Sequence, residues 1–239
     1  MLVAVGQESQ RQWPARLPRR LVQLYLGLAL YGISDALLVL AALGLDPWDV
    51  FHQGLSRTIG LGIGTWSIIV GAAVLLLWIP LRQRPGFGTL SNVLAIGAVM
   101  NLVLAHVSPP HAMAVRIVVL VAAVALNGVA TGCYIGAGLG PGPRDGLMTG
   151  WASRGHSIRV VRTIIEVSVL IIGFLLGGKV GVGTVLYAVC IGPLAHVFIP
   201  LFKVRLVSAA APPSELTSTV APGCASDTQQ RTPETPSYQ

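Results

Sequence analysis

Long apolar stretches separated by short polar turns make up most of this chain. Six of them are close to the ~17–25 residues that a membrane-spanning helix needs. They cover residues 21–43, 65–81, 90–107, 115–135, 160–176 and 182–202. The pattern therefore predicts an all-α membrane protein with six transmembrane helices.

The polar turns recur at a spacing of roughly 95 residues. A Gly-x-Gly-Thr turn precedes the third stretch at residues 86–89 and the sixth at residues 181–184. Because three spans separate the two copies, the second copy enters the membrane from the opposite side. We predict two inverted repeats of three helices each, over residues 21–107 and 115–205.

A proline-containing polar motif follows the first helix of each half. Asp46 is suited to cap a helix, Pro47 to occupy its first position, and Asp49 to face the positive end of its dipole. We therefore predict short interfacial or re-entrant helices after the first and fourth spans, with a direct ligand role for the motif as the alternative. The second copy of the motif contains Pro143, Arg144 and Asp145.

Glycine recurs at every fourth residue along the end of the fourth stretch. Such a stripe lets another helix approach closely in lipid. We predict that it packs against the first helix, and close approach to a ligand is the alternative. The stripe consists of Gly128, Gly132, Gly136 and Gly140.

Few polar side chains fall inside the predicted spans. Asp35 has no nearby partner in the sequence, and a charge at the bilayer centre costs at least ~2.5–3.5 kcal/mol, so it should face a partner or a wet cavity. Thr89 and Thr184 begin the third and sixth helices, and Asn101 and His196 lie about three turns further along. We predict that these five residues line a substrate pathway between the halves.

Structural roles are the alternative for these residues. The threonines can cap their helices. His196 can bond a backbone carbonyl that Pro193 leaves free. Glu166 can pair with Arg162 on its own helix. Asp49 and His52 could share a metal, but Met148 stands at the matching position of the second half, so we expect no metal.

Composition excludes several function classes. The mean hydropathy is +0.72 and only 10% of residues are charged, against about a quarter in soluble domains. The sequence has no nucleophile elbow, zinc pair or phosphate loop, so we expect neither an enzyme nor a cofactor. The net charge of +7 is spread over helix ends, which fits anionic lipids and not nucleic acid.

The basic residues also predict the orientation. With a cytoplasmic N-terminus, twelve lie near the cytoplasmic ends of the helices and only Arg57, Arg116 and Lys179 near the outer ends. Both termini are then cytoplasmic. We expect residues 1–20 to form a basic N-terminal segment and residues 206–239, rich in Pro, Ser and Thr, a disordered tail.

The run from Gly44 to Ser56, the Gly-x-Gly-Thr turns and the later segment from Pro143 to Met148 resemble the YczE/YyaS/YitT family of bacterial integral membrane proteins. The resemblance implies an inner-membrane protein without an established substrate. From the inverted repeats we expect a small secondary transporter or permease, with an anionic solute among the candidates. The alternative is a membrane scaffold or regulatory partner of another protein, and the oligomeric state stays open.

Overall fold

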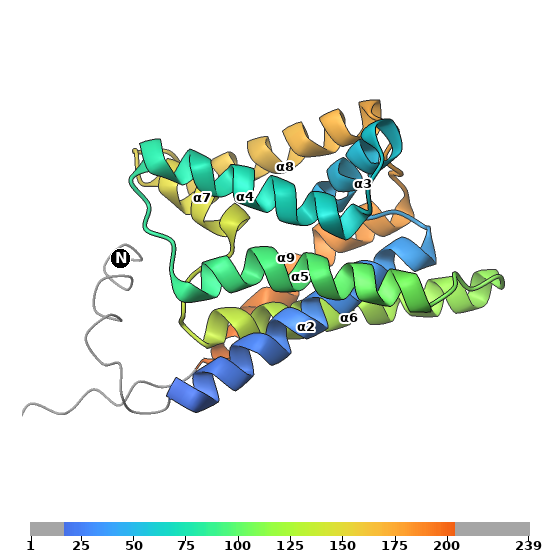
Figure 1. The fold of residues 1–239 in the computed structure, drawn as a ribbon, viewed down its shortest axis with the longest axis horizontal. Coiled ribbons are helices and arrows are strands. Elements are labelled where there is room, and N and C mark those ends of the chain that lie inside the picture. The colour runs from blue at the N-terminus through green and yellow to red at the C-terminus, as the bar shows by residue number, and fades with distance from the viewer. Residues whose placement is uncertain (1–16, 204–239) are drawn as a thin grey trace, which may run out of the picture. The chain divides into compact units, whose positions relative to one another are not determined.

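The computed structural model describes residues 17–203, which form helices and no strand. Five of the helices are long and apolar enough to cross a membrane: α2, α4, α5, α6 and α9. In order (Figure 1), the helices are α2 (Leu17–Ala41), α3 (Pro47–Ile59), α4 (Ile63–Leu81), α5 (Phe87–His106), α6 (Met113–Gly136), α7 (Pro143–Ala152), α8 (Ile158–Leu175) and α9 (Val182–Phe202).

Helix α8 coincides with the fifth predicted span. It has 18 residues and carries three charged side chains along that length, Arg159, Arg162 and Glu166, and it is not among the five apolar helices. Two of these charges pair, because Arg162 Nε donates to Glu166 Oε1 over 3.0 Å. The structural alternative for Glu166 is therefore realised.

The first helix starts earlier than the sequence predicts. Helix α2 begins at Leu17, so Arg19 and Arg20 belong to it and not to a separate N-terminal segment. The Arg20 side chain is buried, and its guanidinium donates to the carbonyls of Ala137 and Gly138 over 2.8 and 2.7 Å. The rest of the N-terminal segment and the tail over 206–239 lie outside the described residues.

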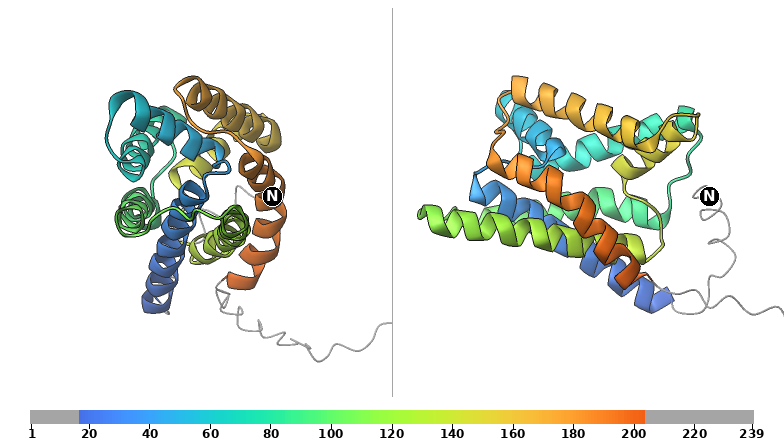
Figure 2. Two further views of the ribbon diagram at one scale, coloured as in Figure 1. Left: turned by 90° about the vertical axis from the view of Figure 1, so that its right-hand side faces the viewer. Right: turned by 180° about the vertical axis from the view of Figure 1, so that it is seen from behind.

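The helices form two layers, which Figure 2 shows from the end and from behind. In one layer α5, α2, α6 and α9 contact one another in that order; in the other, α4, α3, α8 and α7 form a closed ring of contacts. The short helices α3 and α7 lie toward opposite ends of the long ones (Figure 1), with α3 against α8 and α7 against α4.

Both short helices occur where the sequence predicts them, after the first and fourth long helices. Asp46 caps α3 by accepting the N–H of Asp49 over 2.6 Å, and Pro47 occupies the first turn. Pro143 has the same position in α7, where Gly142 is the N-cap. The capping logic read from the sequence is confirmed for α3.

The glycine stripe packs against α9 and not, as expected, against α2. A Cβ atom added at Gly132 would lie 2.7 Å from Phe198 Cβ, and one added at Gly136 would lie 2.6 Å from the carbonyl oxygen of Phe202. Gly140 lies beyond the helix end with a φ of +130°, against Thr89. Helices α2 and α6 do contact each other, but through a different set of residues that includes Gly27.

An arginine from the neighbouring helix caps the C-terminal end of both α2 and α6. Arg116 donates to the carbonyls of Ala41 and Ala42 over 2.7 and 2.9 Å, as Arg20 does at the end of α6. The last carbonyls of a helix have no partner within the helix, so each arginine satisfies groups that would otherwise be buried without one.

Candidate functional site

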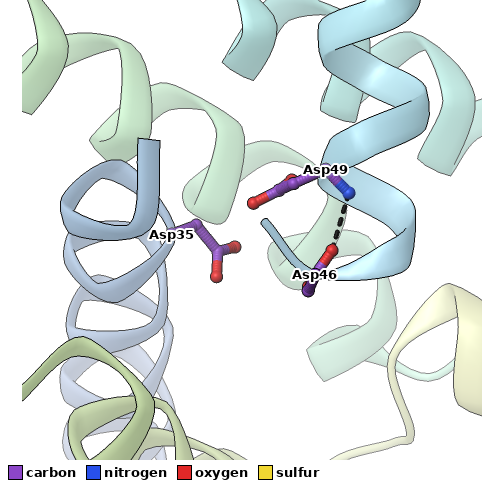
Figure 3. A group of neighbouring side chains, drawn as sticks. All are labelled: Asp35, Asp46 and Asp49. Atoms are coloured by element: carbon purple, nitrogen blue, oxygen red, sulfur yellow. Dashed lines mark hydrogen bonds between the residues drawn. The ribbon is translucent and has the colours of Figure 1, made fainter. Parts of the chain in front are cut away.

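Three buried carboxylates meet where α3 begins beside α2 (Figure 3). Asp35 projects from α2, Asp46 precedes α3, and Asp49 lies in the first turn of α3. One oxygen of each lies within 4.8 Å of the others, and none of the three residues is more than 4% exposed. Acidic side chains are seldom buried without a compensating charge, so this cluster is the most unusual polar feature of the described residues.

Asp46 has the strongest set of partners in the cluster. It accepts the Asp49 N–H, and its second oxygen accepts from Arg144 Nη1 over 3.3 Å. The Arg144 guanidinium also lies 5.3 Å from the ring centre of Tyr31, a cation–π distance. Burial, and then the charge of Asp49, raise the pKa of Asp46, which lies outside the spanning helices.

Asp35 is held by Asn127 of α6. The Asn127 amide donates to Asp35 Oδ1 over 3.0 Å, and its oxygen accepts from the Tyr187 hydroxyl over 3.1 Å. Asn127 is fully buried, so both bonds exist without competition from solvent. This chain of three side chains joins α2 through α6 to α9.

Asp49 is bonded to His52, one turn further along α3. His52 Nδ1 lies 3.1 Å from Asp49 Oδ1. A carboxylate oxygen can only accept, so an ionised Asp49 fixes the proton of a neutral His52 on Nδ1 and leaves Nε2 as an acceptor. The sequence alone favours no metal at this pair, because Met148 stands at the position of the second half that matches His52.

A cavity with an accessible volume of about 70 Å³ adjoins the cluster. Asp35, Asp46 and Asp49 line it, together with residues of α4, α5 and the start of α7. Four buried polar atoms on its wall have no hydrogen-bond partner, although such atoms are rarely left unpaired. They are Tyr31 Oη, Trp48 Nε1, Asp49 Oδ2 and His52 Nε2.

A second cavity of about 90 Å³ lies among α6, α8 and α9 and the starts of both short helices. Arg162 and Glu166 of α8 line it. Four residues line both cavities and thus form a shared wall: Trp48, Tyr134, Arg144 and Asp145. Within this wall the Tyr134 hydroxyl donates to Asp145 Oδ2 over 2.6 Å.

The structure does not bring the five predicted pathway residues together. Of the five, Asp35 alone lines either of these two cavities. Thr89 is buried and donates to the carbonyl of Pro141, while Thr184 accepts the N–H of Gly181 at the start of its own helix.

The remaining two pathway residues have other surroundings. Asn101 joins α5 to α4, since its amide donates to Thr65 Oγ1 over 2.9 Å and its oxygen accepts the N–H of Gly64. His196 lies on an exposed face of α9. The symmetry of Asn101 and His196 in the sequence thus corresponds to no shared cavity.

These features describe an all-helical membrane protein whose polar cavities lie between two helix layers. The chain belongs to a family of unknown function, DUF6198, whose profile matches residues 18–200. The resemblance seen in the sequence is thereby confirmed.

The relatives carry no assigned activity. An uncharacterised protein of Haemophilus influenzae is 41% identical over 188 residues, which cover 78% of this chain and 86% of the relative. The uncharacterised membrane protein YczE of Bacillus subtilis is 36% identical and covers 66% of this chain and 75% of its own. YyaS of the same organism is 25% identical over 77% of this chain and 94% of its own. No solved structure matches the chain.

Proposed function

We propose that this protein is a small secondary transporter or permease-like protein of the bacterial inner membrane. In this proposal α2, α4, α5, α6, α8 and α9 all span the bilayer, as two inverted repeats with both termini in the cytoplasm. Basic helix ends on that side contact anionic lipids.

Reciprocal contacts between the halves support the inverted repeat. Arg20 and Arg116 occupy equivalent positions, and each caps the first long helix of the other half. Each Gly-x-Gly-Thr turn also binds the loop that follows the first long helix of the other half. Gly88 N–H donates to the carbonyl of Leu139 and Gly183 N–H to that of Leu43, both over 2.9 Å.

The two cavities support a transport pathway because they are related by the same repeat. The long helices of the first half line one cavity and those of the second half line the other, except that Tyr134 of α6 faces both. Equivalent positions face them in at least four cases: Asp35 with Thr131, His52 with Met148, Gly71 with Glu166, and Ile96 with Ile191.

The observation that carries the proposal is the wall between the cavities. Trp48 and Arg144 are equivalent residues at the starts of the two short helices, and both face both cavities. If a pseudo-two-fold axis passes between these two residues, one half can rock against the other about it. This motion would open one cavity and close the other. We infer that this pair forms the barrier.

The cavities favour a small solute, since each has room for only a few waters. The expectation of an anionic solute rested on free amides at the starts of the third and sixth predicted helices, and residues 86–89 and 181–184 line neither cavity. The start of α3, which does face the first cavity, is already occupied by Asp46 and Asp49, so this cavity is unsuited to an anion.

Cysteine accessibility in vesicles tests the proposal. Ser67→Cys in the first cavity and Thr131→Cys in the second are introduced with the native cysteines replaced by serine, and Val118→Cys serves as a control on the lipid-exposed face of α6. We expect membrane-impermeant thiol reagents to reach positions 67 and 131 from opposite sides, while position 118 stays unreactive for lack of water.

Trp48→Ala provides the decisive comparison. If Trp48 is the barrier, its removal should make both cysteines reactive from the same side. Protection of both positions from both sides, in the native background and with Trp48→Ala, would contradict a pathway and favour a non-transporting scaffold.

A further inference from the structure

We propose that Asp35, Asp46 and Asp49 bind one divalent metal cation in the first cavity. The proposal deepens the transport function, on which its physiological role as a coupling or transported ion rests. The binding itself is measurable without transport.

The negative charge of the three carboxylates supports a bound cation. With all three carboxylates ionised, Arg144 is the only arginine or lysine among residues 17–203 that forms an ion pair with the cluster, and it reaches only Asp46. Two negative charges are then uncompensated at residues that are at most 4% exposed. Buried carboxylates are costly unless they are paired or coordinate a metal, and one divalent cation supplies the missing charge.

Unpartnered polar atoms around the same cavity also support a bound cation. Within residues 17–203, Asp49 Oδ2 has no donor, Tyr31 Oη and His52 Nε2 have no partner, and the Trp48 indole N–H has no acceptor. All four residues are more than 90% buried and line the same cavity as the cluster. These four unpartnered atoms indicate a ligand independently of the negative charge of the three carboxylates.

A partly hydrated cation supplies partners for the unpartnered acceptor atoms and for the unpartnered Trp48 N–H donor. The carboxylates coordinate the ion, and its water molecules donate to His52 Nε2 and accept from the Trp48 N–H. A volume of about 70 Å³ has room for such an ion and a few waters. The bond from His52 Nδ1 to Asp49 orients the coordinating carboxylate, as histidine–carboxylate pairs do around metals.

The donor set indicates the class of metal. Carboxylate, hydroxyl and water oxygens suit Mg²⁺, Ca²⁺ and Mn²⁺. Thiolate ligands are missing from the wall that residues 17–203 form, because neither Cys133 nor Cys190 lines this cavity. Asp145, the fourth acid on the wall, is bonded to Tyr134 and stands outside the cluster.

The test is Mn²⁺ binding to the purified full-length protein in detergent, after treatment with chelator, followed by electron paramagnetic resonance. We expect one saturable Mn²⁺ per chain. Asp35→Asn and Asp49→Asn should each weaken binding at least about tenfold. His196→Gln, which changes an exposed side chain of α9 that lines neither cavity, should leave the affinity within about twofold.

Size-exclusion profiles check that each variant is folded. If one of the two asparagine variants, at Asp35 or at Asp49, does not fold, the Mn²⁺ affinity of the other decides the test. Absence of saturable binding by wild-type protein would overturn the site. Equal binding by wild type and the asparagine variants would identify an adventitious ion only. The thiol-accessibility experiment runs in chelator, so a protein that fails one test and passes the other shows which proposal is wrong.

Discussion

Replacing Gly132 with alanine tests how closely α6 and α9 approach. The added Cβ would lie 2.7 Å from Phe198 Cβ and 2.8 Å from its carbonyl carbon and oxygen. Carbon atoms prefer separations of about 3.5–4.0 Å, so α9 must move outward by almost 1 Å. Overpacking of this kind costs about 1–3 kcal/mol, which lowers the ratio of folded to unfolded protein about 5- to 150-fold.

Gly192→Ala is the matched control, because no heavy atom lies within 4 Å of a Cβ added there. Reversible unfolding in mixed micelles measures both variants. We expect Gly132→Ala to be destabilised and Gly192→Ala to match wild type or exceed it slightly. Equal stabilities of the two variants would refute the close contact between α6 and α9, and Gly132→Leu should then fold with normal yield.

Two further changes probe the topology and the polar link that joins α2, α6 and α9. Reporter fusions after Pro109 and after Lys203 should give external and cytoplasmic signals respectively, and the reverse result at either position would contradict the inverted repeat. Asn127→Ala should destabilise the protein by about 2–5 kcal/mol, measured by the same unfolding assay, because it leaves both Asp35 and Tyr187 without their buried partner; a loss below about 0.5 kcal/mol would show that neither bond matters to stability.

The long helices could be predicted because each needs an apolar stretch of sufficient length. Val182–Phe202 matches its predicted range. The start of α2 was missed because Arg19 and Arg20 were assigned to the basic N-terminal segment. Arg20 instead finds carbonyls at the end of α6, a contact that joins residues 117 positions apart and leaves no local signal.

The candidate site was only partly predictable. The helix cap at Asp46 depends on neighbours in sequence, and an isolated Asp35 in an apolar helix already indicates a polar surrounding. His196 was misplaced because symmetry does not say which face of a helix is buried. Helix α9 packs on α6 through Leu194, Phe198 and Phe202, which are spaced four residues apart, and this turns His196 outward.

The exchanged arginine caps have a consequence for how the protein is made. The end of α2 needs Arg116, which is synthesised about 75 residues later, and α6 needs Arg20 from the first half. An emerging first half would therefore expose unpaired carbonyls until the fourth long helix leaves the ribosome and inserts. We therefore expect the early helices to remain incompletely packed until α6 is in place. Either half expressed alone lacks the arginine that binds the last carbonyls of its first long helix.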